Sequence, residues 1–488
     1  SAGIRDAFPP VSLRRGGERP LPAQLVEQLR QAIDHGTLRP GERLPATRAL
    51  AERLGVSRGT VLTAYDQLIA EGYLTAVQGR GTEVNARLGD AARRLPALPP
   101  VPREPEPRSG GSATQGPLSP GAPLTDTVDS PAWRAAWREA ARSAHGPVPP
   151  AGDERLRAEI AEHLRRMRGT DRPARDITVT AGARDGLGLL LTALGSSRGH
   201  RVTVGVENPG YPSLRGVAQR HGAEIVALPV DEQGLDPAAL PKHGLQLLIV
   251  TPSHQYPLGG SLSLERRRDL LDWAARSGVI IVEDDYDSEL RESGAPLPAL
   301  AALDDPANGV VATLGTFSKT VSPALATGFL LTPPPLSALV RPVREQLGSP
   351  VSGITQQALA SYLSSGELRR HTVRMRRRYR ERRAAVLRAL AGIPGVRARP
   401  MSGGLHAVIT LGIDAAPAEQ GRAEERVLAA SDAAGLGARG LAGYWQHTPE
   451  PGAERGLVIG LGGPDEIAFH AALRALAALC RADARDQE

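Results

Sequence analysis

The N-terminal part of the chain shows apolar residues at helical spacing. Leu21, Leu25 and Leu29 recur at every fourth position, which places them on one face of a helix. The pattern predicts three helices and then two short β runs, over about 21–36, 46–54, 58–71, 73–77 and 79–84. Three helices joined by tight turns and followed by a β-hairpin are the order of a winged helix-turn-helix, whose third helix enters the major groove of DNA.

The beginning of the third predicted helix carries the residues best placed to contact DNA. Ser57 is predicted to cap this helix, since serine is favoured at the N-cap, and Arg58 and Thr60 follow in the first turn. An arginine there reaches guanine or phosphate. Arg80 precedes Gly81 at the tip of the predicted hairpin, which suits a phosphate or minor-groove contact. The alternative is a helical interaction module, because similar helix triplets occur in dimerisation domains.

One long segment of this module resembles the DNA-binding domain of GntR-type regulators almost continuously; it is G-E-R-L-P-A-T-R-A-L-A-E-R-L-G-V-S-R-G-T-V-L-T-A-Y-D-Q-L-I-A-E-G-Y-L. The resemblance implies that Arg48, Arg58 and the wing at 79–81 contact DNA. The net charge of +6 and a pI of about 9.8 permit a nucleic-acid partner. Residues 1–88 contain 12 Arg against 9 Asp plus Glu, a local excess of +3.

Composition separates this module from the rest of the chain. The helical periodicity fails from about residue 85, where prolines crowd together and a Gly/Ser-rich run follows. Pro-rich stretches act as semi-rigid spacers and Gly/Ser-rich stretches as flexible ones. We predict a DNA-binding domain at 10–85, a linker without chemistry of its own at 86–123, and an effector domain at 124–485 that includes a small αβ subdomain at about 391–485.

Short apolar runs alternate with helical patterns in the large domain. The predicted strands are 177–180, 202–206, 224–228, 245–250, 279–282 and 310–314. Such alternation predicts a mostly parallel sheet covered by helices on both faces. Ligands of such sheets bind outside the carboxyl ends of the strands, so the residues that follow each strand are the candidates for a site.

Three of these loops carry groups suited to a phosphorylated aromatic ligand. Gly182, Ala183 and Arg184 begin a helix after the first strand, and their backbone N–H groups are predicted to cradle a phosphate. Tyr211 follows the second strand and offers a ring for stacking. A Pro/Gly-shaped loop, T-P-S-H-Q-Y-P-L-G-G, then presents the side chains of His254 and Tyr256.

The run E-D-D-Y after the fifth predicted strand combines a carboxylate and a phenol. Side chains two residues apart in a strand share a face, so Asp284 and Tyr286 are predicted to point the same way. A buried carboxylate beside a pyridine nitrogen keeps that nitrogen protonated, and a phenol donates to a ring oxygen. Singly, such a cluster is more often a solvated loop or a metal site.

Lysine is rare in this chain, with two lysines among 59 Lys plus Arg. Lys319 follows the strand at 310–314, whereas Lys242 lies in a loop-like run. Arginine replaces lysine as a charge but cannot form a Schiff base. Codon bias with a chance survivor is the alternative. With Thr316 and Ser318 nearby as hydroxyl donors, Lys319 completes the parts of a pyridoxal phosphate (PLP) site.

Three motifs of the large domain, T-P-S-H-Q-Y-P, E-D-D-Y-D-S-E and G-T-F-S-K-T, match the MocR family, in which a GntR-type winged helix is joined to a fold-type-I aminotransferase-like domain. The resemblance covers nearly the whole chain. It implies Lys319 as the Schiff-base lysine, Asp284 at the pyridine nitrogen, Tyr286 at the ring oxygen and Tyr211 on the ring. It also implies a domain-swapped, head-to-tail homodimer.

One position departs from the family pattern. The family usually has an arginine seven residues after the lysine, which clamps the cofactor phosphate. Here the run is P-A-L-A-T-G, and the position is Ala326. The resemblance therefore implies a PLP site whose affinity for the cofactor is reduced.

The C-terminal part adds weaker candidates. Residues 368–390 read as a long helix with a basic run, which favours a solvated helical face over a second DNA site. Arg455 precedes a predicted strand and is a candidate for an effector carboxylate, although a surface arginine is as good a reading. Cys480 is the one cysteine, so no intrachain disulfide forms and a reducing cytoplasm fits. No apolar run reaches membrane-spanning length, the start lacks a signal-peptide core, and we predict no metal site.

The sequence thus predicts a cytoplasmic MocR-type transcription regulator that binds operator DNA and senses PLP or its adduct with an amino compound. Genes of vitamin B6, amino-acid or amine metabolism are the expected targets. Two alternatives stay open. The chain is a working aminotransferase that carries a DNA-binding domain, or its PLP site is degenerate and senses another ligand.

Overall fold

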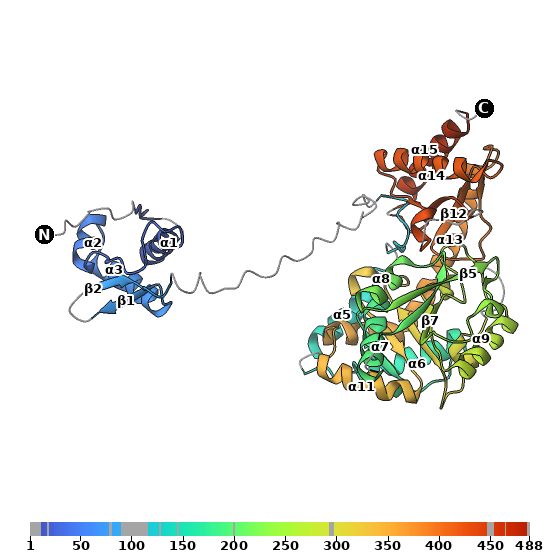
Figure 1. Ribbon diagram of the computed structural model, residues 1–488, viewed down its shortest axis with the longest axis horizontal. Helices are drawn as coiled ribbons and strands as arrows, with labels where there is room; N and C mark the ends of the chain where they lie inside the picture. Colours follow the sequence, from blue (N-terminus) through green and yellow to red (C-terminus); the bar gives the residue numbers. More distant parts are fainter. Residues whose placement is uncertain are drawn as a thin grey trace. The chain divides into compact units, whose positions relative to one another are not determined.

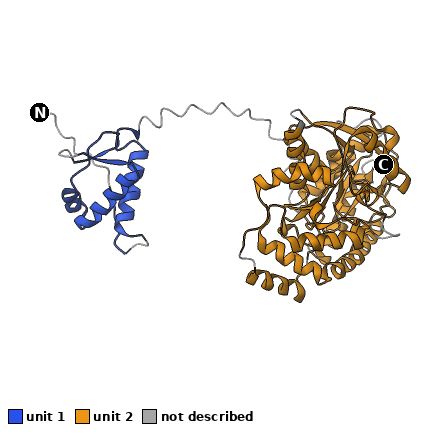
Figure 2. Cartoon of the chain, turned by 90° about the horizontal axis from the view of Figure 1, so that it is seen from below, with its two compact units in different colours: residues 1–111 blue, residues 112–488 orange. Residues whose placement is uncertain are grey.

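The computed structural model describes residues 11–16, 19–77, 81–88, 116–125, 128–143, 146–198, 201–291, 297–446, 453–463 and 465–485. The chain forms two compact units, Ser1–Gly111 and Ser112–Glu488, which Figure 2 colours separately. Figure 1 labels the principal helices and strands of each.

The smaller unit is a winged helix-turn-helix, as predicted. Its elements are α1 (Leu21–Asp34), α2 (Thr47–Leu54), α3 (Arg58–Ala70), β1 (Leu74–Val77) and β2 (Gly81–Val84). The two strands pair antiparallel. Leu25 and Leu29 of α1 are fully buried with Val61 and Leu68 of α3, so the apolar stripe seen in the sequence forms the core. Gly55, with φ +63°, ends α2 in the left-handed conformation that suits glycine.

The larger unit is built on an eight-stranded, mostly parallel sheet with the order β3-β10-β9-β8-β7-β4-β5-β6. The strands are β3 (Ile177–Thr180), β4 (Thr203–Asn208), β5 (Glu224–Asp231), β6 (Gly234–Leu235), β7 (Leu247–Val250), β8 (Ile280–Asp285), β9 (Val311–Thr316) and β10 (Gly328–Leu331). All six predicted strands are present. The structure adds β10, which is antiparallel to both neighbours, and the short edge strand β6.

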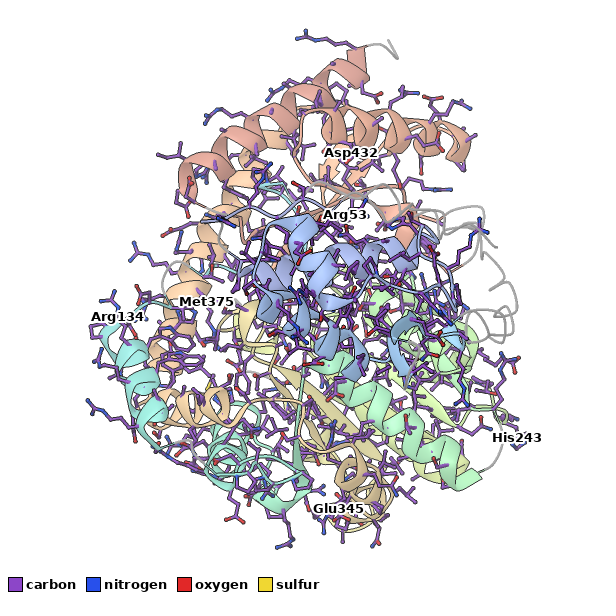
Figure 3. All side chains as sticks on the ribbon, turned by 90° about the vertical axis from the view of Figure 1, so that its left-hand side faces the viewer. Arg53, Arg134, His243, Glu345, Met375 and Asp432 are labelled. Atoms are coloured by element: carbon purple, nitrogen blue, oxygen red, sulfur yellow. The ribbon has the colours of Figure 1, made fainter. Side chains whose placement is uncertain are left out.

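Helices cover both faces of this sheet. They are α5 (Pro131–Ser143), α6 (Glu154–Arg168), α7 (Ala183–Arg198), α8 (Pro212–Arg220), α9 (Leu264–Ser277), α10 (Leu300–Leu303), α11 (Pro334–Leu347) and α12 (Gly353–Ser364). Successive residues of β7 enter different cores: Leu248 packs with α6 and α9, and Leu247 with α7, α8 and α11. This alternation is why β7 reads as a continuous apolar run. Exposed polar residues such as Arg134, His243 and Glu345 project outward (Figure 3).

The C-terminal part forms a second sheet with the order β11-β12-β14-β13. It contains α13 (Glu367–Leu390), β11 (Val396–Ala398), β12 (His406–Leu411), α14 (Pro417–Ala433), β13 (Arg439–Gly440), β14 (Gly456–Gly460) and α15 (Glu466–Arg485). The strands pair antiparallel. Phe469 and Cys480 of α15 are buried in the core beneath it, so the reading of Cys480 as a core residue agrees with the structure.

The predicted linker ends earlier than residue 123. Leu118 and Leu124 are buried in the core of the C-terminal subdomain. The Leu118 N–H donates to the Leu436 carbonyl at 2.9 Å, and the Gly460 N–H donates to the Leu118 carbonyl at 2.7 Å. Residues 116–123 therefore belong to the larger unit, and the linker interpretation was wrong for them because their partners are distant in sequence. Residues 89–115 lie outside the described part of the chain.

The basic run of α13 is not simply a solvated face. Arg382 is 1% exposed, and its Nη1 donates to the carbonyls of Leu461 and Gly462 at 2.8 and 2.6 Å. Its guanidinium also lies 4.5 Å from the ring centroid of Phe469. The prediction was wrong for this residue because two backbone carbonyls and one aromatic ring of the C-terminal region surround the guanidinium in place of solvent.

In the described part of the chain, no helix is both long and apolar enough to cross a membrane.

Candidate functional site

Four neighbouring strands bring the predicted site residues to one edge of the large sheet. Strands β9, β8, β7 and β4 are adjacent and parallel, so the residues that end them meet at the same edge. Tyr211 caps α8 after β4 and lines a cavity with Asp284 of β8. Lys319 follows β9 on the other side of β8.

Asp284 is a buried carboxyl without a partner of its own. It is 4% exposed, and no hydrogen bond or ion pair joins its carboxyl to another residue of the described ranges. Burial, followed by the charges of Asp285, Asp287 and Glu207, raises the pKa of Asp284 to about 8, while Lys319 acts in the opposite direction. The carboxyl therefore stays neutral near pH 7 until a cationic N–H group faces it.

Lys319 reaches from its loop toward the same region. Its Nζ donates to the Gly121 carbonyl at 2.5 Å. Burial lowers the pKa of Lys319, with Asp284 and Asp287 opposing this effect and the Arg184 guanidinium adding to it. A lowered pKa increases the fraction of the free amine, which is the nucleophilic form.

Three tyrosines form the aromatic side of the site. The ring centroids of Tyr211 and Tyr256 are 5.3 Å apart, and those of Tyr256 and Tyr286 are 5.7 Å apart, both edge-to-face. Burial raises the pKa of Tyr256 and Tyr286 well above the ordinary value, so both hydroxyls keep their protons. Tyr286 donates to the His254 carbonyl at 3.1 Å.

His254 links this aromatic group to an acid. Its Nδ1 lies 3.0 Å from the Tyr286 hydroxyl and 2.9 Å from Asp287 Oδ2. Among the described residues, His254, Asp287 and His406 bring their ligand atoms within 4.8 Å of one another, the one such trio of metal-ligand type. Asp287 already bonds His254, and His406 Nε2 lies 2.8 Å from the Pro257 carbonyl, whereas His254 Nε2 and His406 Nδ1 are buried without a hydrogen-bond partner among the described residues.

The residues predicted to hold a phosphate gather where β3 ends. Gly182 has φ +94°, and a Cβ on it would lie 3.9 Å from Thr316 Oγ1, so this turn and the lysine loop are adjacent. Ala183 begins α7. Arg184 is exposed and its Nε donates to Ser213 Oγ at 2.6 Å. The Ser318 N–H donates to Thr316 Oγ1 at 3.1 Å.

Ala326 lies in the turn between the lysine loop and β10. It is exposed and has φ +43° and ψ +44°, and it is the one described non-glycine residue with positive φ. Two residues later, Gly328 packs so closely that a Cβ there would lie 2.9 Å from the Gly182 Cα. The position therefore adjoins the turn expected to hold the phosphate, in a conformation that is strained for alanine.

The effector candidate Arg455 lies away from this edge. It precedes β14, and its carbonyl accepts from the Leu411 N–H at 3.1 Å. His406, which does adjoin the site, pairs with Gly460 at the other end of β14. The strand between spans roughly 17 Å at about 3.3 Å per residue, so the structure does not bring Arg455 to Lys319.

The DNA-binding candidates lie at the exposed start of α3. Ser57 Oγ accepts from the Thr60 N–H at 3.2 Å, which is the predicted cap. Arg58 is exposed at the first position of the helix. Arg48 is exposed on α2 and forms an ion pair with Glu52 at 3.4 Å. Gly81 begins β2 with φ +91°, whereas Arg80 lies outside the described residues.

Sequence reasoning missed several residues at the edge of the large sheet where β4, β7, β8 and β9 end. Glu207 is 5% exposed and accepts from the Thr251 N–H at 3.2 Å and the Thr251 Oγ1 at 2.5 Å; burial raises its pKa to about 7. Arg215 lines the cavity and donates to the Tyr444 carbonyl at 3.3 Å. An acid directly after a buried strand was a usable signal for Glu207. No local pattern marks Gly121, because its contact spans 198 residues.

Comparisons with known proteins agree with this geometry. The family of bacterial regulatory proteins of the gntR type matches residues 21–84, and the family of class I and II aminotransferases matches residues 114–419. The pyridoxine biosynthesis transcriptional regulator PdxR of Corynebacterium glutamicum is 45% identical over 94% of this chain and 95% of its own length. The chain belongs to the MocR family of transcription regulators.

Other relatives place this MocR-family protein in the same group. The probable rhizopine catabolism regulatory protein MocR of Rhizobium meliloti is 37% identical over 76% of this chain and 77% of its own length. Among solved structures, a kynurenine aminotransferase of Pyrococcus horikoshii has a TM-score of 0.65 at 23% identity over 81% of this chain and 98% of that one. At that identity the likeness supports the aminotransferase-like fold of the larger unit alone.

Proposed function

We propose that this MocR-family protein is a transcription regulator whose larger unit binds PLP at Lys319 and responds to PLP or to its adduct with an amino compound. The partnerless, buried Asp284 carboxyl supports this proposal most directly. The raised pKa of this carboxyl means that burial disfavours an unpaired carboxylate. A protonated ring nitrogen would give the carboxylate the partner that it lacks. Binding of operator DNA by the winged helix supplies the output.

The described residues fit this cofactor. PLP supplies an aldehyde that reacts with amines and a pyridine ring that withdraws electrons. With PLP bound, Asp284 would accept a hydrogen bond from the ring nitrogen, and Tyr211 would supply an aromatic surface for the ring. Lys319 supplies the amine. The Tyr286 hydroxyl, which donates to the His254 carbonyl, would be the donor to the ring oxygen, and the ring of Tyr256 packs edge-to-face against Tyr286.

At the phosphate end of the proposed site, the Arg184 guanidinium is a cation that could replace the arginine missing at position 326. Arg184 is close enough to Lys319 to lower the pKa of that amine, and it is the second residue of α7, the helix that follows the turn at Gly182. A dianion there gains both from the helix N-terminus and from the guanidinium. In this proposal Arg184 supplies part of the phosphate binding that Ala326 cannot supply. We therefore expect Arg184→Ala to weaken PLP binding.

We expect Ala326→Arg to tighten PLP binding at least several-fold. A hydrogen bond to a charged group is worth about 1.5–3 kcal/mol, which corresponds to roughly 10- to 150-fold in affinity. The substitution keeps a Cβ in the same left-handed conformation, so it adds little backbone strain. A titration of the visible PLP band measures the change. Ala324→Arg, which adds the same charge at an exposed position of the same turn, is the control; equal affinities of all three proteins contradict the prediction.

We expect Arg58→Ala to cost about 1–3 kcal/mol of DNA-binding free energy and to relax the preference for one base. Arg80→Ala should weaken binding evenly across sequences. Titrations of labelled promoter fragments at fixed salt measure both effects, with Arg422→Ala, at an exposed position of α14 in the larger unit, as a matched loss of charge. If the chain forms the proposed head-to-tail homodimer, footprints contain two half-sites. An isolated smaller unit that binds none of its own promoter DNA contradicts the assignment.

Two rival functions have separate tests. Turnover of amino donors with a keto acid identifies a working aminotransferase. A visible spectrum that does not change on addition of PLP identifies a site that senses another ligand. The name of the PdxR relative favours genes of vitamin B6 synthesis as targets here, with amino-acid and amine metabolism next; transcript levels in a deletion strain test this choice.

A further inference from the structure

A short segment at the start of the larger unit joins the C-terminal subdomain to the lysine of the proposed site. Besides the backbone bonds of Leu118, the Leu124 N–H donates to the Tyr379 hydroxyl at 2.9 Å. Between these two anchors, the Gly121 carbonyl accepts from Lys319 Nζ at 2.5 Å. Residues 116–125, which we call the anchor segment, are thus held at both ends by the subdomain and in the middle by the amine.

The fit around this contact leaves little free space. Gly121 has φ +88°, and a Cβ on it would lie 3.2 Å from Lys319 Nζ. On the other side, Cβ atoms on Gly460 and Gly462 would lie 2.0 Å from the Ser119 carbonyl oxygen and 1.6 Å from the Ala122 carbonyl oxygen. The backbone of the anchor segment therefore lies directly against these glycines, and a change at Lys319 acts on a closely packed segment.

Covalent attachment of a carbonyl ligand changes what Lys319 is able to donate. The free amine has two N–H groups, and the ammonium three. When Nζ forms a C=N bond with an aldehyde, the C=O bond breaks and its oxygen leaves as water with two protons from the nitrogen. At most one N–H remains, and the nitrogen is fixed to the ligand. When an amino compound takes over the aldehyde carbon, the Lys319 amine is regenerated without any oxidant or reductant.

We propose that the Gly121 carbonyl is a latch that reports whether the Lys319 amine is free. The inference rests on the proposed attachment of PLP to Lys319. With the amine free, the anchor segment is held. With PLP attached, Gly121 loses its donor and the segment loosens. An amino compound that displaces Lys319 from PLP closes the latch again, so the segment responds alike to the PLP-free state and to the amine adduct.

The contact between Gly121 and Lys319 lies near the point where the chain enters the larger unit. The anchor segment is the first described part of the larger unit, and the chain preceding it runs through residues 89–115 to the winged helix. If the anchor segment becomes less stable, the point at which the chain from the DNA-binding unit joins the larger unit becomes less stable too. Lys319 is the one lysine or arginine that donates a hydrogen bond to a carbonyl of this segment among the described residues.

Hydrogen exchange of the full-length protein tests the latch. Exchange at the amides of Leu118, Ser119, Gly121, Ala122 and Leu124 is measured without PLP, with PLP, and with PLP plus an excess of a primary amine such as alanine. We expect at least tenfold faster exchange with PLP, equivalent to about 1.4 kcal/mol of lost protection, and a return toward the PLP-free rate with the amine. A visible spectrum of each sample records whether PLP is attached.

Variants keep the test independent of the cofactor. Lys319→Met retains an apolar stem without a donor, so the segment should exchange at least tenfold faster than wild type even without PLP. Lys319→Arg retains N–H donors but cannot attach PLP, so it should stay slow with and without PLP. Lys242→Met, an exposed lysine, is the control. Unchanged exchange in Lys319→Met overturns the latch whatever the spectrum shows. An absent visible band in wild type overturns the proposed function instead.

Discussion

Lys319→Ala is expected to abolish covalent attachment of PLP completely. Reduction of the wild-type protein with borohydride after addition of PLP should add the cofactor mass to the peptide that contains Lys319, and the visible band should disappear as the bond is reduced. The physical reason is that Lys319 is a half-buried amine of lowered pKa in the loop after β9, the strand that pairs with the Asp284 strand β8. Mass spectrometry of the reduced, digested protein measures the result.

Lys242→Ala provides the matched control, because Lys242 is the other lysine of the chain and is exposed. Its visible band and its labelled peptide should equal those of wild type. If both variants keep the band, or if the mass appears on a peptide without Lys319, the assignment of the amine is wrong. If wild type itself shows no band at any PLP concentration, the proposal that the site is degenerate replaces the present one.

The sequence predicted the large sheet well because its strands carry their own signals. A run such as L-L-I-V in β7 is buried on both faces and ends in a Pro/Gly-rich loop, so its period and its end are local properties. Parallel pairing then brings the loop residues together, which is why strand order predicted that Tyr211, Asp284 and Lys319 lie at one edge of the sheet. Strand β10 (G-F-L-L) was missed because it follows β9 without an intervening α-helix and is antiparallel to both neighbours, so it does not fit the alternation of strands and helices that marked the others.

Contacts between distant segments were beyond sequence reasoning. Residues 116–125 have the same Pro/Gly-rich composition as the linker before them, and their burial depends on Leu436 and Gly460, more than 300 residues away. Arg382 reads as one arginine among many, and the carbonyl groups that desolvate it lie about 80 residues further along. The anchor segment and this arginine therefore owe their positions to tertiary packing rather than to local pattern.

The acid of the proposed site should make the stability of the PLP-free protein fall as pH rises. The pKa of Asp284 is raised from 3.8 to about 8 in the folded protein. Between these values the folded state holds a proton that the unfolded state releases, so the free energy of unfolding decreases with pH. The stabilisation is fully present below about pH 4 and is lost as pH passes 8, amounting to on the order of 5 kcal/mol over the whole window.

Asp284→Asn should remove this dependence, because an amide does not ionise. The expected result is that the variant unfolds at a higher urea concentration than wild type at pH 8.5 and that this advantage becomes smaller at pH 5.5, both without PLP. The stability of Glu207→Gln is measured for comparison. Burial also raises the pKa of Glu207, to about 7, but unlike Asp284 this carboxyl accepts hydrogen bonds from Thr251, which the substitution disturbs. With PLP added, the order should reverse at pH 8.5: the protonated ring nitrogen becomes the partner of Asp284, so wild type gains more stability than Asp284→Asn. Parallel pH profiles of the two proteins would contradict the neutral state of the carboxyl, and equal stabilisation by PLP would contradict its role at the ring nitrogen.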